Sequence, residues 1–136
     1  MHEKRKVRVL VADDEGHIRS LINLILTSLG AEVVAEASDG EQALRLYKEH
    51  RPDMAILDIN MPKLDGISVL KEVMALEPKT LVVMLTSLNS LDTAKECIEN
   101  GAWNYILKNT TAEELNKALR ETWGDYMAAL KDSKRS

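Results

Sequence analysis

Five short apolar runs alternate with longer segments along this chain. The runs are rich in Val, Ile and Leu, which is typical of strands buried on both faces of a sheet. The second run is the weakest, because Glu32 and Glu36 interrupt it, and a strand at the edge of a sheet tolerates such charges. We predict strands at residues 7–12, 31–37, 54–58, 81–86 and 103–107.

The longer segments repeat apolar residues at intervals of three and four, as amphipathic helices do. Glycine or proline follows each of the first four segments, and both residue types end helices. The last segment follows Thr111, with Glu114 three residues later in a capping-box arrangement. We therefore predict five helices. Their expected starts include Asp39-Gly40, Asp65-Gly66, Ser90 or Asp92, and Thr111, and their expected ends are Gly30, Pro52, Pro78 and Asn100-Gly101.

Alternating strands and helices favour right-handed crossovers, which make the strands parallel and place helices on both faces of the sheet. The predicted fold class is a doubly wound α/β domain with five strands and five helices. The length of 136 residues suits one domain with a single sizeable core. We expect an N-terminal tail at residues 1–5, the domain at 6–130, and a C-terminal tail or truncated linker at 131–136.

Composition narrows the class of protein. Apolar residues make up 45% of the chain and charged residues 29%, which is the profile of a soluble globular domain. No apolar stretch approaches the ~20 residues that span a bilayer, so we expect no membrane segment. The net charge of −4 argues against nucleic-acid binding by the domain as a whole. A single cysteine, Cys97, excludes an intrachain disulfide and suits a reducing cytoplasm, where we expect the protein.

Polar side chains that can carry chemistry stand where four of the apolar runs end. Asp13 and Asp14 follow the first run, Asp58 the third, Thr86 ends the fourth, and Lys108 follows the fifth. In an open parallel sheet the carboxyl ends of the strands share one edge, and ligands bind there. Three carboxylates, a hydroxyl and an ammonium would then meet in one pocket. That set suits Mg²⁺ together with a phosphoryl group.

Four motifs give the chain a resemblance to a known family. They are the acidic pair at 13–14, the stretch DINMPKLDG at 58–66, Thr86-Ser87, and GAWNYILK at 101–108. In this order, each at a strand end, they resemble the receiver domains of bacterial two-component response regulators over about residues 6–123. The resemblance implies a flavodoxin-like sheet with strand order 2-1-3-4-5.

The resemblance also implies an activity. A sensor histidine kinase, a phosphotransfer protein or a small phosphodonor would phosphorylate the carboxylate of Asp58. Asp13, Asp14, Asp58 and the backbone carbonyl of Asn60 would hold a divalent cation, Mg²⁺ in the first place and Mn²⁺ as the alternative. Attack of a carboxylate on an anionic phosphoryl donor needs such a cation to relieve charge repulsion. The protein would phosphorylate and dephosphorylate itself, as a switch rather than a turnover enzyme.

The implied switch uses residues on both sides of the acceptor. Lys108 and Thr86 would contact the phosphoryl oxygens. Thr86 would move toward the phosphoryl group, and Tyr105 would rotate into the space beside the fourth helix. The output face would consist of the fourth helix, the fifth strand and the fifth helix. A downstream protein or output domain would bind there, with no role for a membrane or for direct nucleic-acid contact. The resemblance also leaves open whether phosphorylation makes the protein form a homodimer.

The chain departs from the family at one loop. Most members have a proline after the lysine, whereas Asn109 follows Lys108 here. A non-proline cis bond costs ~2.5–4 kcal/mol, so we predict a trans peptide. The resemblance implies that Leu88 flanks the attacking water and could shield the phosphoryl group, so we expect slower dephosphorylation than in chemotaxis-type receivers. Asn60, at the other flanking position, acts in the opposite direction. The pattern around Tyr105 and Glu114 resembles receivers joined to helix-turn-helix domains, so the chain is either a stand-alone receiver or part of a longer transcriptional regulator.

Two other functions compete. A phosphatase of the haloacid-dehalogenase type also uses a strand-end aspartate, but it needs a second aspartate where Asn60 stands. Its acidic pair also follows the nucleophile rather than preceding it. The other alternative is a pseudo-receiver that only binds partners, although such domains usually lose a key residue and none is lost here.

Overall fold

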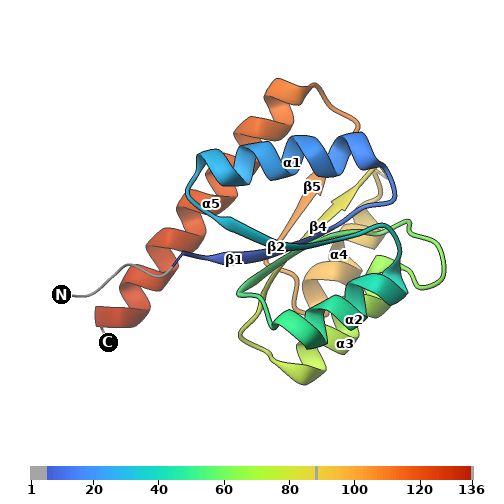
Figure 1. The fold of residues 1–136 in the computed structure, drawn as a ribbon, viewed down its shortest axis with the longest axis horizontal. Coiled ribbons are helices and arrows are strands. Elements are labelled where there is room, and N and C mark those ends of the chain that lie inside the picture. Colours follow the sequence, from blue (N-terminus) through green and yellow to red (C-terminus); the bar gives the residue numbers. More distant parts are fainter. Residues whose placement is uncertain (1–5, 88, 136) are drawn as a thin grey trace.

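Five parallel strands form one central sheet in the computed structural model, which describes residues 6–87 and 89–135 (Figure 1). The strand order is β2-β1-β3-β4-β5, as the family resemblance implied. Each predicted strand is present, and three of them begin one residue later than predicted. The strands are β1 (Arg8–Ala12), β2 (Glu32–Ala37), β3 (Met54–Asp58), β4 (Leu81–Thr86) and β5 (Asn104–Leu107).

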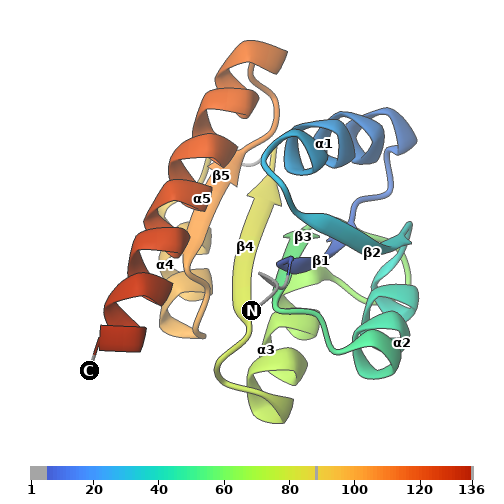
Figure 2. The same cartoon turned by 60° about the vertical axis from the view of Figure 1, so that its left-hand side comes forward.

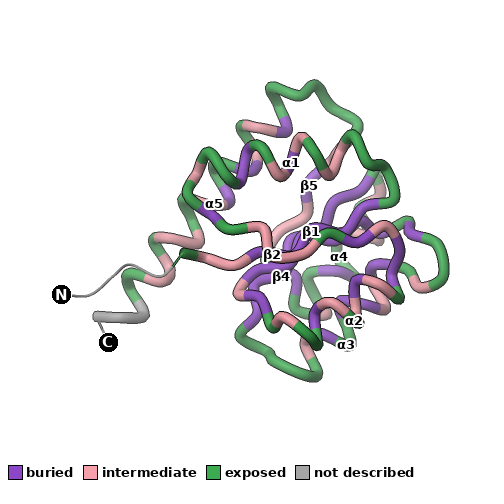
Figure 3. The backbone as a smooth tube through the Cα atoms, in the orientation of Figure 1, coloured by how far each residue is buried: buried purple, intermediate pink, exposed green. Residues whose placement is uncertain are grey.

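Helices cover both faces of the sheet. The helices α1 and α5 pack on one face, and α2, α3 and α4 pack on the other (Figures 1 and 2). All residues of the central strands β3 and β4 are buried, whereas β2, at one edge, is only partly covered (Figure 3). This explains why β2 tolerates two glutamates. The helices are α1 (Gly16–Ser28), α2 (Gly40–His50), α3 (Gly66–Leu76), α4 (Leu91–Glu99) and α5 (Ala112–Arg135).

Side-chain caps fix the starts of four helices. Asp39, Asp65 and Thr111 accept backbone N–H groups at the starts of α2, α3 and α5, as expected for these residue types. Ser90 rather than Asp92 caps α4, because its hydroxyl accepts the N–H of Thr93 at 3.3 Å. None of the described helices is long and apolar enough to cross a membrane.

The last helix is longer than its apolar stripe. The last apolar residue of α5 is Leu130, and the helix continues to Arg135. No glycine or proline lies in residues 131–136 to stop the helix, so its hydrogen-bond ladder continues. The expected domain boundary at residue 130 stays a prediction.

Two glycines allow close backbone contacts around the loop after β3. A Cβ atom at Gly66 would overlap the carbonyl oxygen of Asp58, and one at Gly40 would overlap that of Leu64. The N–H of Gly66 also donates to the carbonyl of Ile59 at 2.8 Å. The start of α3 is therefore pressed against the backbone that carries Asp58, and a side chain cannot enter between them.

We predict that Gly66→Ala destabilises the fold. The added methyl group must push α3 away from the end of β3, and overpacking of this kind costs about 1–3 kcal/mol. Urea unfolding followed by tryptophan fluorescence measures the loss. The matched control is Gly124→Ala in α5, where no atom lies within 4 Å of the new Cβ. That variant should gain about 0.5–1 kcal/mol, because alanine favours helix. Equal stability of the two variants would contradict the packing argument.

Candidate functional site

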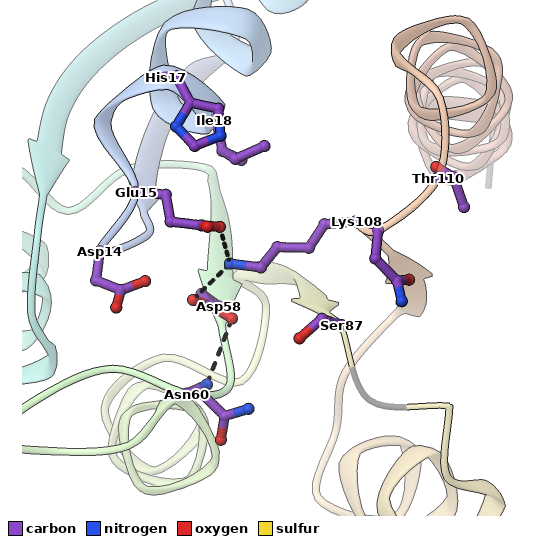
Figure 4. A pocket seen from close by; sticks show the side chains of 10 residues that line it. Asp14, Glu15, His17, Ile18, Asp58, Asn60, Ser87, Lys108 and Thr110 are labelled. Atoms are coloured by element: carbon purple, nitrogen blue, oxygen red, sulfur yellow. Dashed lines mark hydrogen bonds and ion pairs between the residues drawn. The ribbon is translucent and has the colours of Figure 1, made fainter.

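The carboxyl ends of β1, β3 and β5 open into a pocket of about 520 Å³. Asp14 and Glu15 reach it from the loop after β1, Asp58 from the end of β3, and Lys108 from the end of β5. Figure 4 shows the Lys108 side chain extending across the pocket toward Glu15 and Asp58. The parallel topology has thus brought Asp14, Asp58 and Lys108 to one pocket, whereas Thr86, which we expected there too, does not line it.

Lys108 is the electrostatic centre of this pocket. Its Nζ atom lies 3.0 Å from Asp13 Oδ2, 3.0 Å from Asp58 Oδ2 and 2.9 Å from Glu15 Oε2. The two aspartates and the ammonium are nearly inaccessible to solvent, whereas Glu15 is exposed. Three carboxylates therefore contact one ammonium, and the nearby Asp14 adds a fourth negative charge, so the site has an excess of negative charge.

Backbone contacts hold Asp13 in place. Its N–H donates to the carbonyl of Ala37 in β2 at 3.0 Å, and its Oδ1 accepts the N–H of Glu15 at 2.8 Å. Its carbonyl accepts Nη1–H of Arg19 at 2.6 Å. Our sequence reasoning missed the contributions of Glu15 and Arg19. The position of Glu15 directly after the acidic pair was the only available signal, since Arg19 on a helix surface looks like an ordinary charge.

Burial changes the acidity of the groups in the pocket. It raises the pKa of Asp58 to about 6; the hydrogen bond from Lys108 opposes this shift and the charge of Asp13 adds to it. Burial also raises the pKa of Asp13. Burial alone would lower the pKa of Lys108, but hydrogen bonds to Glu15, Asp58 and Asp13 outweigh it and raise that pKa. The ammonium is therefore charged at neutral pH.

Asp13, Asp14 and Asp58 form a set that can hold a metal ion. One carboxylate oxygen of each residue lies within 4.8 Å of those of the other two. Asp14 is exposed, and no hydrogen bond or ion pair of its side chain is present among the described residues. Hard oxygen ligands with uncompensated negative charge suit a small divalent cation. Asn60 also borders the pocket, and its N–H donates to Asp58 Oδ1 at 3.3 Å.

Thr86 lies beside the pocket but is engaged elsewhere. It ends β4 and is fully buried, and Ser87 rather than Thr86 lines the pocket. The hydroxyl of Tyr105 has hydrogen bonds with the Thr86 side chain and with the backbone of Ser90. Burial raises the pKa of Tyr105, which these hydrogen bonds oppose. The structure therefore joins the two predicted switch residues directly.

The loop after Lys108 agrees with one further prediction. The Lys108–Asn109 peptide is trans, as are the other described peptide bonds. Leu88, on which the expectation of slow dephosphorylation rested, lies outside the described residues.

Comparison with known proteins gives one consistent family. Residues 9–120 match the family model described as the response regulator receiver domain. The chain is 37% identical over 115 residues to the chemotaxis protein CheY of Bacillus subtilis, covering 85% of this chain and 96% of that protein. It is 36% identical over 109 residues to the regulatory protein AtoC of Escherichia coli, covering 80% of this chain but only 23% of AtoC.

Solved structures agree with these relatives. A chain in the crystal structure of the CheX-CheY-BeF3-Mg²⁺ complex from Borrelia burgdorferi superposes with a TM-score of 0.78 and 31% identity, over 85% of this chain and 88% of that chain. The signal receiver domain of the response regulator NarL from Mycobacterium tuberculosis superposes with a TM-score of 0.75 and 36% identity, over 86% and 95%.

The raised pKa of Asp58 predicts a pH-dependent effect of Asp58→Asn. Between the ordinary value of 3.8 and about 6, the folded protein holds this proton more tightly than the unfolded chain does. The stability of the parent protein therefore falls as pH rises through this range, and the amide variant avoids the loss. At about pH 7.5 without Mg²⁺, the variant should be more stable by up to about 3 kcal/mol, the equivalent of that pKa difference.

Urea unfolding at about pH 4.5 and about pH 7.5 in the presence of a chelator measures the effect, because these values lie below and above the folded-state pKa of about 6. The advantage of Asp58→Asn should shrink at the lower pH. Asp132→Asn, on the exposed end of α5, serves as the control and should change stability little at either pH. If the stability difference between Asp58→Asn and the parent did not change with pH, burial would not destabilise the ionised Asp58 carboxylate, and the prediction would be wrong.

Proposed function

The chain belongs to the response regulator receiver domain family, and on that premise we propose that Asp58 is its phosphoacceptor. Receiver domains are signalling modules of two-component systems rather than turnover enzymes. The observation that carries the assignment is the position of Asp58, which is 1% exposed at the end of the central strand β3 and shares the Lys108 ammonium with Asp13. Because the chain belongs to the receiver domain family, we set aside the alternative of a phosphatase of the haloacid-dehalogenase type.

The proposed reaction uses the Asp58 carboxylate as the nucleophile. One Oδ atom attacks the phosphorus of the donor, a phosphohistidine of a sensor kinase or phosphotransfer protein or a small acyl phosphate. The bond from phosphorus to the donor atom breaks, and the donor leaves with its electron pair. Asp58 then carries an acyl phosphate. With a pKa of about 6, most Asp58 side chains are ionised and nucleophilic at neutral pH.

Three other groups support this step in the proposal. Asp13, Asp14 and Asp58, with the backbone carbonyl of Asn60, hold Mg²⁺, for which Mn²⁺ can substitute. The cation supplies positive charge that lowers the repulsion between carboxylate and phosphoryl group. The Lys108 ammonium, already 3.0 Å from Asp58 Oδ2, transfers its hydrogen bond to a phosphoryl oxygen. Hydrolysis of the acyl phosphate at the same site resets the protein.

The proposed readout runs through Thr86 and Tyr105. A phosphoryl group on Asp58 adds strong acceptor oxygens, and Thr86 turns from Tyr105 to donate to one of them. Tyr105 then loses its hydrogen bond with Thr86 and changes rotamer beside α4. The surface formed by α4, β5 and α5 is the output face, where a downstream domain or protein, or a second phosphorylated copy, binds.

We predict that Asp58 is the only phosphorylation site. Incubation with acetyl phosphate and Mg²⁺ should add one phosphate to the parent, as intact-mass measurement detects, and Asp58→Asn should add none. Omission of the metal should slow labelling strongly, because the crowded carboxylates then repel the donor. Full labelling of Asp58→Asn would disprove the assignment.

Asp14→Asn separates metal binding from folding in the same assay. Asp14 is exposed and has no partner among the described side chains, so its loss should leave the basal stability nearly unchanged. Millimolar Mg²⁺ should raise the melting temperature of the parent by mass action and fail to do so for this variant. An equal Mg²⁺ response in both proteins would exclude Asp14 as a ligand.

The proposed readout predicts where the structure changes on activation. Addition of beryllofluoride, a phosphoryl mimic, should give the largest NMR shifts at Thr86, Tyr105 and α4. Thr86→Ala should retain phosphorylation at Asp58 and lose most of the shifts at Tyr105, because the connecting hydroxyl is gone. Shifts concentrated on α1 and α2, with Tyr105 unmoved, would place the output elsewhere.

A further inference from the structure

The edge strand β5 and helix α5 enclose a groove on the proposed output face. Its volume is about 390 Å³, and we call it the β5–α5 groove. Figure 2 shows β5 alongside α5, with α4 beyond it. The apolar residues of its lining, which we call its floor, are Tyr105, Ile106, Leu107 and Ala118, and the uncharged polar residues Asn104, Thr110 and Thr122 line it as well. The groove is thus a candidate seat for apolar side chains of a partner.

The rim of the groove on α5 is acidic. Glu114, Glu121 and Asp125 line it, and no lysine or arginine does. These residues are exposed and are spaced by seven and four positions, so they follow one face of α5 over about 16 Å at 1.5 Å per residue. Arg120, the nearest cation to Glu121 in sequence, bonds with Asn116 on its own helix and with Ser28 of α1. The groove lining itself therefore carries net negative charge, with Lys117, one turn from both Glu114 and Glu121 on α5, as the neighbouring cation outside it.

Exposed apolar side chains of α4 continue the surface on the far side of β5. Leu91 is 85% exposed and Ile98 is 50% exposed. Leu91 follows Ser90, whose backbone is hydrogen-bonded with the Tyr105 hydroxyl, so the start of α4 lies close to Tyr105. Leu91 and Ile98 are seven positions apart, so they lie on one face of α4.

The edge of β5 does not favour an added strand. The N–H of Tyr105 donates to the side chain of Asn104 at 2.8 Å, and the Leu107 carbonyl accepts the Thr110 hydroxyl at 3.4 Å. A partner strand would have to displace these side chains to pair with the backbone. A partner helix needs no backbone pairing and only requires the apolar floor and the charged rim.

From these observations we propose that the β5–α5 groove binds a basic amphipathic helix of a partner protein. The apolar face of that helix packs on Tyr105 and Leu107, and its lysines or arginines pair with Glu114, Glu121 and Asp125. The assignment of this face to output rests on the proposed function, whereas the chemistry of the partner rests on the groove itself. An acidic rim repels nucleic acid and anionic membranes, so neither occupies it.

Two synthetic helical peptides test the proposal with the full chain. They share one leucine face and differ in their polar face, which carries lysine and arginine in one and glutamate in the other. Fluorescence anisotropy, with and without beryllofluoride, should show binding of the basic peptide only. The triple variant Glu114→Gln, Glu121→Gln, Asp125→Asn should bind about tenfold more weakly, as expected for the loss of three exposed ion pairs. Added salt should weaken binding to the parent by screening.

A matched variant controls for net charge. Glu41→Gln, Glu49→Gln, Glu72→Gln removes the same number of charges from exposed positions on α2 and α3, across the sheet from α5, and should bind the basic peptide as the parent does. Equal weakening by both triple variants, binding of both peptides, or binding of neither would overturn the proposal. A doubled mass in sedimentation that the rim variant abolishes would assign the groove to a second copy and would also overturn it.

The same proteins separate this inference from the proposed function. Phosphorylation by acetyl phosphate is measured on each variant by intact mass, and the rim variant should be labelled like the parent, since none of its changes lies in the pocket. If Asp58 is not labelled but the basic peptide binds through the rim, only the proposed function fails. If Asp58 is labelled and the rim variant binds unchanged, only the groove inference fails.

Discussion

Two buried aspartates side by side repel each other, and the ammonium group of Lys108 is what makes this arrangement tolerable at the end of the sheet. It lies within 3.0 Å of both Asp13 and Asp58 and binds Glu15 at 2.9 Å as well. One positive charge still faces four carboxylates once Asp14 is counted. The pocket is therefore short of positive charge, and this shortage favours both a divalent cation and the protonated form of Asp58.

The rigidity of the surrounding fold holds this strained pocket together. Asp58 lies at the end of a fully buried strand, and α3 presses Gly66 against its carbonyl. Asp13 is fixed by Ala37, Glu15 and Arg19. Buried charges destabilise the fold, but the two apolar layers on either side of the sheet compensate for them. The charged residues of the pocket thus lower the stability of the fold at the place where the proposed chemistry needs them, and the apolar core supplies the stability that they cost.

The proposed route from site to surface is short. Thr86 lies next to the pocket and is hydrogen-bonded with Tyr105, and Tyr105 forms part of the floor of the β5–α5 groove. A change in the partner of one hydroxyl can therefore alter the shape of the surface on which a partner would dock. This route needs no large motion of the sheet, which suits a domain whose core is closely packed. In the proposed interaction, the acidic residues of α5 favour a basic partner.

The sequence by itself determined the architecture and most of the site. Short apolar runs such as 54–58 and 81–86 predicted the central strands, and the rule that parallel strands share their carboxyl edge brought Asp13, Asp14, Asp58 and Lys108 together. Local chemistry also predicted the caps at Asp65 and Thr111 and the trans peptide before Asn109. These features depend on a few neighbouring residues and on one topological rule, so they can be read from the order of the residues.

Tertiary structure alone decided the contacts between distant side chains. The sequence did not show that Glu15 shares Lys108, that Arg19 holds the Asp13 carbonyl, or that Thr86 is hydrogen-bonded with Tyr105 instead of lining the pocket. Nor did it show that three acidic residues of α5 line one groove. Each of these depends on side-chain rotamers and on the exact placement of one helix or strand against another. Periodicity fixes the face on which a residue lies, but only packing fixes which neighbour it meets.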